Sequence, residues 1–183
     1  MKATGIVRRI DDLGRVVIPK EIRRTMRIRE GDPLEIYTDR EGEVIFKKYS
    51  PIGEIAGFSA EYAETLHKTC DITVVICDRD AVIACAGVSK RDYADRKMSE
   101  ELEKIMERRQ LFVCRSLNER ISAVRDNDSH YVSCAMPIIA EGDMIGCVCA
   151  LRSRDGDKDA TVSDSEIKLI QTAAVFLARQ MEA

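Results

Sequence analysis

The sequence predicts an α+β protein built from two domains, residues 1–50 and residues 51–183. Three observations lead to this prediction. Two short β-runs around a glycine turn lie near the N-terminus and precede a basic helical segment. Apolar alternation returns in the longer part of the chain, beyond a boundary at Ser50 and Pro51. With 45% hydrophobic residues among 183, the longer part has enough apolar material for a sizeable core.

The first expected element is a β-hairpin. A β-run that ends at Ile10 and a second run over residues 15–18 enclose a turn, in which Gly14 supplies the positive φ of a tight connection. Apolar side chains fall on both faces of the first run, with Ile6 and Ile10 on one face and Val7 on the other. A module of this size has little interior, so we expect an intertwined dimer that covers both faces.

A basic helix should begin at Pro19, because the first helical position needs no N–H donor. Ile22 and Met26 lie four residues apart and share a face that packs. Another face carries cations at positions i, i+3, i+4 and i+7, namely Lys20, Arg23, Arg24 and Arg27. A second hairpin over residues 34–46, with Gly42 in its turn, completes the order ββαββ.

Charge is distributed unevenly along the chain. Residues 1–30 hold nine Lys or Arg against four Asp or Glu, whereas residues 51–183 hold 17 against 23. The mildly acidic pI of about 5.6 therefore conceals a basic end and an acidic end. We expect the basic end to meet polyanions such as nucleic acid.

The N-terminal strings closely resemble one known family. Thr4–Pro19, Glu21–Arg24, Leu34–Tyr37 and Lys47–Tyr49 are similar to the N-terminal domain of the AbrB family of bacterial transition-state regulators. The resemblance implies a swapped-hairpin dimeric β-barrel that binds double-stranded DNA through arginines of both chains. It assigns the DNA contacts to Arg8, Arg15, Arg23 and Arg24. Charge geometry alone adds four further cations, Lys2, Arg9, Lys20 and Arg27.

The second domain should begin and end with a helix. Ser50 as N-cap and Pro51 as first residue open a helix that ends near Cys70. Ser163 and Glu166 form a capping-box pair ahead of the last helix. Apolar stripes run along both helices, at Ile55, Phe58, Tyr62, Leu66 and Thr69 on the first and at Ile167, Ile170, Ala174, Leu177 and Met181 on the last. Such stripes either join subunits or cover the domain's own sheet, and both interpretations stay open.

Strands and one further helix are expected between these two helices. The strands are Ile72–Cys77, Ala81–Ala86, Leu111–Arg115, Tyr131–Ile139 and Met144–Leu151, and the helix is Asp92–Arg109. Short polar turns at residues 78–80 and 141–143 predict antiparallel neighbours. This order resembles a GAF sensor domain, whereas a PAS domain ordinarily opens on strands. The resemblance implies a small, unidentified effector, bordered by the polar loops Ser89–Asp95 or Ser116–Ser129.

No metal or cofactor is expected. The seven cysteines are odd in number and lack a Cys-x-x-Cys pair, so they are interpreted as small buried hydrophobes in a reducing compartment. A thiolate pair at Cys147 and Cys149 is the weaker alternative. The string Asp155, Asp157, Asp159 and Glu166 has the spacing of a calcium-binding loop, but Ala160 replaces the required glycine. A solvated acidic loop explains it better.

Other classes of function find little support. The longest uninterrupted apolar runs have eight residues, and no signal-peptide pattern follows Met1, so we expect a cytoplasmic protein that does not enter membranes. No phosphate-binding glycine loop or hydrolase motif occurs, and His67 and His130 are the only histidines, which argues against an enzyme.

The favoured hypothesis is a homo-oligomeric transcription regulator, activator or repressor, because the two-domain architecture resembles that of sporulation regulators with an AbrB-type domain. Residues 1–50 would form the dimer, and the terminal helices of residues 51–183 would join dimers into a tetramer through Ile55, Tyr62, Leu66, Ile170, Leu177 and Met181. The rival hypothesis is an antitoxin of a toxin–antitoxin pair, a class that uses similar folds. Antitoxins of this class usually carry a disordered tail, whereas this C-terminal region is periodic.

Overall fold

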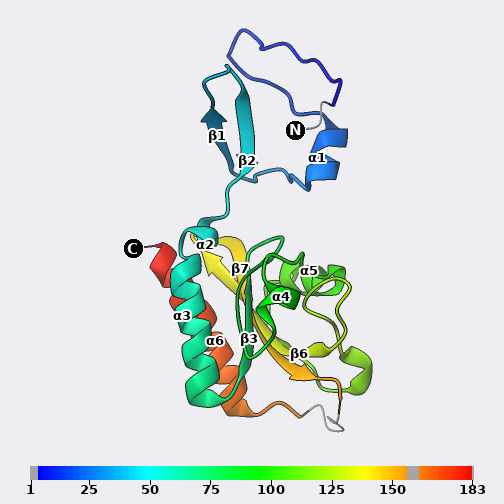
Figure 1. Cartoon of the computed structure of the whole chain (residues 1–183), viewed down its shortest axis with the longest axis vertical. Helices are drawn as coiled ribbons and strands as arrows, with labels where there is room; N and C mark the ends of the chain where they lie inside the picture. Colours follow the sequence, from blue (N-terminus) through cyan, green and yellow to red (C-terminus); the bar gives the residue numbers. More distant parts are fainter. Residues whose placement is uncertain (1–3, 156–160, 183) are drawn as a thin grey trace. The chain divides into compact units, whose positions relative to one another are not determined.

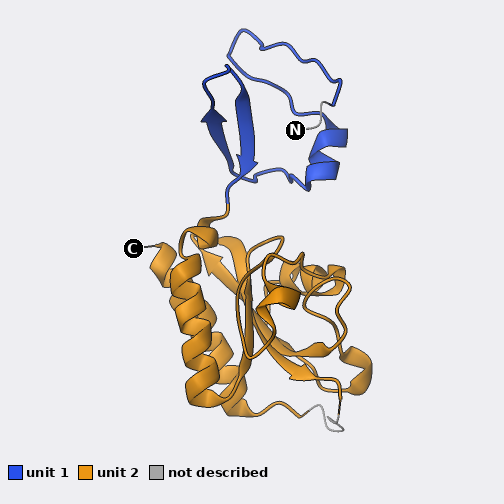
Figure 2. Ribbon diagram, in the orientation of Figure 1, with its two compact units in different colours: residues 1–49 blue, residues 50–183 orange. Residues whose placement is uncertain are grey.

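The computed structural model describes residues 4–155 and 161–182. The chain forms two compact units, residues 1–49 and residues 50–183, which Figure 2 shows in different colours. The first unit contains one short helix and one two-stranded sheet, and the second contains a five-stranded sheet covered by helices (Figure 1).

In the first unit, helix α1 spans Lys20–Met26 and strands β1 and β2 span Leu34–Thr38 and Val44–Lys48. The helix begins one residue later than expected, with Pro19 at its N-cap. The strands pair antiparallel with Ile36 opposite Phe46, and Gly42 lies in the turn with φ of +85°. The predicted second hairpin is therefore confirmed.

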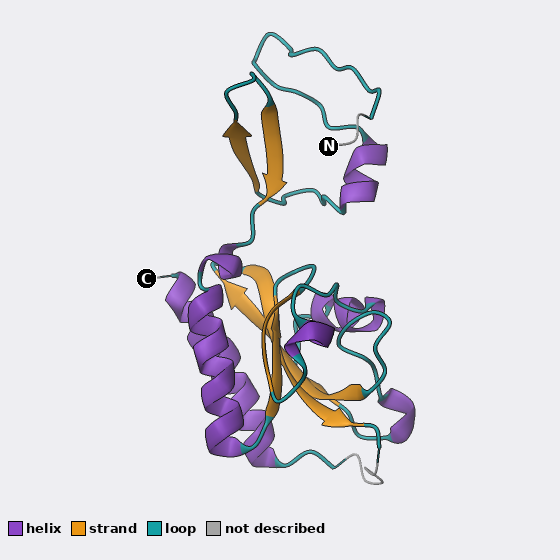
Figure 3. Cartoon of the chain, viewed as in Figure 1, coloured by secondary structure: helices purple, strands orange, loops and turns teal. Residues whose placement is uncertain are grey.

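The strands predicted for the first hairpin are wrong for the single chain. Residues 4–19 form the predicted turn but no strand, as the loop colouring of Figure 3 shows. The turn itself is closed by two backbone hydrogen bonds of 3.0 Å, from Asp11 N–H to the Arg15 carbonyl and from Gly14 N–H to the Asp11 carbonyl. A strand requires a hydrogen-bonded partner, and the two arms below this tip have no such ladder in the described part of the chain.

The first unit has no core of its own. None of its described residues is buried, and even Ile22, on the face of α1 that was expected to pack, is only half-buried. Val7 is 85% exposed and Val17 is 70% exposed. Twelve large apolar side chains are exposed in this unit: Ile6, Val7, Ile10, Leu13, Val16, Val17, Met26, Ile36, Tyr37, Val44, Ile45 and Phe46.

The second unit is built on one antiparallel sheet with the strand order β4-β3-β7-β6-β5. Two long strands, β6 (His130–Ala140) and β7 (Asp143–Ser153), form its centre and its longest pairing. β3 (Thr73–Cys77) pairs with β7 and with β4 (Val82–Ala86), and β5 (Phe112–Val113) pairs with β6. These strands agree with the predicted ones within a few residues, although β5 is shorter.

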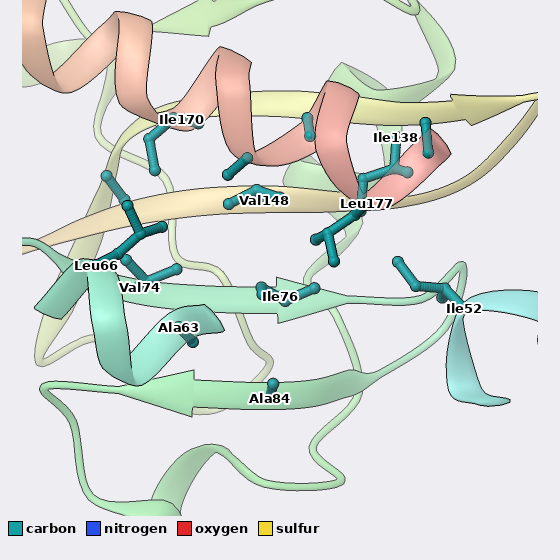
Figure 4. Packing of buried hydrophobic residues seen from close by; sticks show 14 of the residues in the cluster. Ile52, Ala63, Leu66, Val74, Ile76, Ala84, Ile138, Val148, Ile170 and Leu177 are labelled. Carbon is teal, nitrogen blue, oxygen red and sulfur yellow. The ribbon is translucent and has the colours of Figure 1, made fainter. Parts of the chain in front are cut away.

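Each face of this sheet has its own apolar cluster, because neighbouring side chains of a strand point to opposite faces. Val74 and Ile76 pack beneath α3 (Ala56–Cys70) and α6 (Asp164–Met181), with Ile138 and Leu177 in the same cluster (Figure 4). Val75 lies in the second cluster, under α4 (Lys90–Tyr93), α5 (Glu100–Glu107) and the loops around the 3-10 helix η1 (Leu117–Glu119).

The helices of the second unit depart from prediction in two places. The first predicted helix is divided at Ile55 into α2 (Pro51–Glu54) and α3, and Ser50 is the N-cap as expected. The predicted helix Asp92–Arg109 is wrong, since α4 and α5 are separate. Asp95 adopts a left-handed φ of +59°, and the Ser99 hydroxyl then caps α5 by accepting the Leu102 N–H at 3.1 Å.

The last helix shows half of the predicted capping box. The Ser163 hydroxyl accepts the Glu166 N–H at 3.2 Å. The Glu166 carboxylate, however, binds the Arg152 guanidinium at 2.6 Å and accepts the buried Ser133 hydroxyl at 2.7 Å. Glu166 thus ties α6 to the sheet. Of the calcium-like string, Asp157 and Asp159 lie outside the described residues.

The apolar stripes of α3 and α6 mostly cover the domain's own sheet. Leu66, Ile170 and Leu177 are buried in the chain's core, so they do not lie at a subunit seam as predicted. A different edge of the same helices stays open to solvent. There, Phe58, Tyr62 and Phe176 form an aromatic cluster, in which the Phe176 ring lies 5.8 Å from that of Phe58 and 5.5 Å from that of Tyr62.

Six of the seven cysteines are buried and Cys70 is half-buried, in agreement with their interpretation as small hydrophobes. The sulfurs of Cys147 and Cys149 lie 3.5 Å apart. Within the described residues, no group of three or more Cys, His, Asp or Glu side chains is arranged to hold a metal ion. In the same residues, no helix has the length and apolar character needed to cross a membrane.

Candidate nucleic-acid interface

The tip of the first hairpin is organised by one carboxylate. Asp11 Oδ1 accepts the backbone N–H of Leu13 at 3.0 Å and that of Arg15 at 2.8 Å. Its Oδ2 accepts the Nε–H of the Arg15 side chain at 2.8 Å. The hydrogen bonds that Arg15 donates lower the pKa of the Asp11 carboxyl. The bond from its backbone N–H has the larger effect, and the bond from its guanidinium comes second. The turn thus fixes both the backbone and the side chain of Arg15.

The predicted cations of helix α1 fall into two groups. Lys20, Arg23 and Arg24 are exposed on the helix surface. Arg27 is half-buried instead, because it ends the helix in a left-handed conformation with φ of +54°. Its carbonyl accepts a hydrogen bond from Lys48 Nζ at 3.0 Å, so Arg27 also connects the helix to β2.

The remaining predicted contacts lie on the first arm of the open hairpin. Arg8 and Arg9 are exposed, and Arg8 Nη1 donates to the Val7 carbonyl at 3.4 Å. Lys2 lies outside the described residues. The described cations of the predicted set are thus exposed, with the exception of Arg27.

Sequence reasoning missed the role of Asp11. It identified the turn and Arg15 separately but not the contact between them. A usable signal was present in the spacing Asp-x-x-Gly-Arg, since an Asp that opens such a turn accepts N–H groups two and four residues later.

The second unit contains two cavities bordered by the polar loops singled out from the sequence. One, of about 420 Å³, is lined by Arg120, Arg125 and Arg154 together with Glu100 and Asp128. The other, of about 320 Å³, lies between Asp92 and residues 125–129. Arginines and carboxylates neutralise one another in the larger cavity, as in the 3.0 Å pair of Arg125 with Glu100. This lining does not identify one class of ligand.

Comparison with solved structures agrees with the fold of the second unit. The GAF domain of a phosphoenolpyruvate-protein phosphotransferase from Coxiella burnetii matches with a TM-score of 0.53 and 13% identity, over 70% of this chain and 82% of that one. At this identity the likeness concerns the fold alone. The expected GAF fold is confirmed.

Comparison of sequences finds a relative that matches the whole chain. Stage V sporulation protein T of Bacillus subtilis (strain 168) is 55% identical over 183 residues, which span 100% of this chain and 99% of that protein. The transition state regulatory protein AbrB of the same strain is 65% identical over 51 residues, 28% of this chain and 52% of that protein. The expected AbrB-type first domain is confirmed.

Two family models divide the chain between them. A model described as antidote-toxin recognition MazE, bacterial antitoxin, matches residues 7–53. A model described as stage V sporulation protein T C-terminal, transcription factor, matches residues 54–182. Since this second model and the full-length relative together cover the chain, the protein belongs to the stage V sporulation protein T family of transcription factors.

Proposed function

We propose that this protein regulates transcription of sporulation genes without catalytic activity, and that its first unit binds double-stranded DNA as a homodimer. The contacts proposed are Arg8, Arg15, Arg23 and Arg24, with Arg9, Lys20, Arg27 and Lys2 adding positive charge. One observation carries the assignment: Arg15 is held at the tip of a turn with its side chain 69% exposed, on the same unit as the exposed cations of α1. The site of action would be the cytoplasm.

The dimer is proposed because the first unit leaves its apolar side chains uncovered. A first unit whose described residues include twelve exposed large apolar side chains and no buried one lacks the hydrophobic burial that stabilises a fold. A second copy would cover these side chains and supply strand partners for residues 4–19. A swapped-hairpin barrel of two chains satisfies both needs.

The second unit is proposed to join two such dimers into a tetramer. Its aromatic cluster, in which Phe58 and Phe176 are exposed and Tyr62 is half-buried, lies on the terminal helices, and Val175 beside it is 50% exposed. Tethering two DNA-binding dimers raises the effective concentration of the second at a neighbouring site. The cavity near Arg120 and Arg154 is the proposed place for a small effector.

Measurement of DNA affinity over a range of salt concentrations tests the proposed contacts. Each of the substitutions Arg8→Ala, Arg15→Ala, Arg23→Ala and Arg24→Ala should weaken binding. Loss of a phosphate contact makes the slope of log K against log salt shallower by about 0.9, whereas loss of a base contact lowers sequence discrimination. Arg40→Ala, which removes an exposed arginine from the other turn, is the control and should bind normally. Unchanged affinity in all four variants would remove the assignment.

The antitoxin hypothesis is the second candidate, favoured by the MazE match over residues 7–53. The second unit argues against it, because residues 50–183 form a folded domain with clusters on both faces of a sheet. A disordered tail that wraps a toxin would have no such core. Copurification of a small toxin with the natively expressed protein would support this candidate instead.

A further inference from the structure

The first unit uses the same turn twice. Asp11 and Asp39 each accept, through Oδ1, the N–H groups two and four residues later, at 3.0 and 2.8 Å in both turns. In both turns the fourth residue is a glycine, Gly14 or Gly42, with a positive φ of +76° or +85°. Both are also closed by a backbone bond from the Asp N–H to the carbonyl four residues later, at 3.0 and 3.2 Å.

The two turns differ in the residue at their fifth position. It is Arg15 in the first turn and Glu43 in the second. Oδ2 of Asp11 therefore accepts a hydrogen bond from Arg15 Nε at 2.8 Å. In the second turn Glu43 offers Oδ2 of Asp39 no such side-chain donor. Because Oδ1 alone satisfies the turn in both cases, the contact through Oδ2 is not required to form the loop.

We infer that Asp11 is a positioning residue that orients Arg15 to read a guanine in the major groove. This inference rests on the proposed DNA-binding function of Arg15. Asp11 occupies the Nε edge of the guanidinium, and no protein group in the described residues bonds its Nη nitrogens. Two parallel Nη–H donors match the O6 and N7 acceptors of guanine.

Charge favours a base over a phosphate as the partner of Arg15. The Asp11 carboxylate offsets the positive charge of the guanidinium and repels a phosphate brought close to it. The neutral acceptors of a base edge meet no such repulsion. Fixing the guanidinium beforehand also reduces the conformational entropy lost when it forms two hydrogen bonds.

Asp11→Asn in the full-length protein separates orientation from loop formation. Its Oδ1 still accepts the two backbone N–H groups, but an amide NH2 now faces Arg15 Nε–H, so the guanidinium is released. The probes are a duplex that the wild-type protein selects from a random pool and a duplex of shuffled sequence. Asp11→Asn should lower the ratio of the two affinities about tenfold. The salt slope should not become shallower, and affinity for shuffled DNA should not fall.

Matched controls isolate the role of Arg15. Asp39→Asn makes the same loop change in the other hairpin, and Asp12→Asn removes a neighbouring carboxylate from the same turn; both should keep the wild-type ratio. In the Arg15→Ala background, Asp11→Asn should have no further effect, because the residue through which it acts is gone.

The possible failures are distinguishable. If Arg15→Ala binds and discriminates like the wild type, the proposed DNA contact of Arg15 fails first. If Arg15→Ala loses discrimination and Asp11→Asn does not, the orienting role is overturned. It is equally overturned if Asp11→Asn acts as strongly without Arg15, or if Arg15→Ala changes only the salt slope, which would place Arg15 on a phosphate.

Discussion

The two units of this chain bury their apolar side chains to very different extents. The second unit covers both faces of its sheet and leaves one aromatic cluster open near the terminal helices. The first unit buries none of its described residues. The pattern of apolar residues in the sequence therefore has a different meaning in each unit. In the second unit it belongs to a fold that one chain completes, and in the first unit it belongs to one half of a proposed dimer.

The largest expected effect concerns the aromatic cluster of Phe58, Tyr62 and Phe176 on the second unit. Phe58→Glu combined with Phe176→Glu should halve the mass of a tetramer in light scattering, because an uncompensated buried charge costs about 3–5 kcal/mol. The first unit should still form its dimer, since neither residue belongs to it. Leu117→Glu is the control, because Leu117 is 57% exposed and lies outside the aromatic cluster. Equal masses for the folded double variant and the wild type would mean that the cluster joins no subunits.

The sequence predicted an element correctly when contacts between residues close together in the chain stabilise that element. The hairpin β1–β2 was predictable because its turn and its pairing are local. The strands expected on either side of Gly14 failed in the single chain because the two arms form no ladder with each other below the turn, and the strand partners proposed for them lie on a second copy. The break before α5 was missed because the N-cap signal of Ser99 lies inside a segment that otherwise has helical character.

Apolar stripes showed a second limit of sequence reasoning. Phe58 and Leu66 were assigned to one stripe of the first helix, yet Leu66 is buried against the sheet and Phe58 faces solvent beside Phe176. Helical spacing locates an apolar face to within about one residue position. That precision does not tell which side of the stripe packs against the sheet and which side faces solvent. In the candidate site, the exposure of most cations followed from charge pattern alone. The Asp11–Arg15 contact depends on turn geometry.

Dilution tests whether the folding of each unit depends on association with a second copy. A fragment of residues 1–50 should melt at a temperature that falls on dilution, because its folding and association are one equilibrium. A hundredfold dilution lowers the free energy of unfolding of such a dimer by about 2.7 kcal/mol. A fragment of residues 51–183 with Phe58→Glu and Phe176→Glu should melt independently of concentration. A folded monomer of residues 1–50 in sedimentation would contradict the swapped barrel.

The smallest expected effect is a dependence on alkaline pH that belongs to the second unit, since all seven cysteines lie there. Burial raises the pKa of the Cys134 thiol from its ordinary 9.0 to about 12. Between these values the unfolded chain loses a proton that the folded chain keeps, so stability is full below about pH 9 and falls as the pH rises. At pH 10 the loss from this thiol should be about 1.4 kcal/mol.

Urea unfolding of the full chain at pH 8 and pH 10 measures this loss. Cys134→Ala lacks the titrating group, so its stability should fall less between the two pH values, even if the smaller side chain lowers stability at both. The difference between the two variants isolates Cys134 from the other buried thiols, which titrate in both proteins. Equal losses would show that the Cys134 thiol ionises as readily in the folded chain as in the unfolded one. That result would contradict the tight covering of the sheet that distinguishes the second unit from the first.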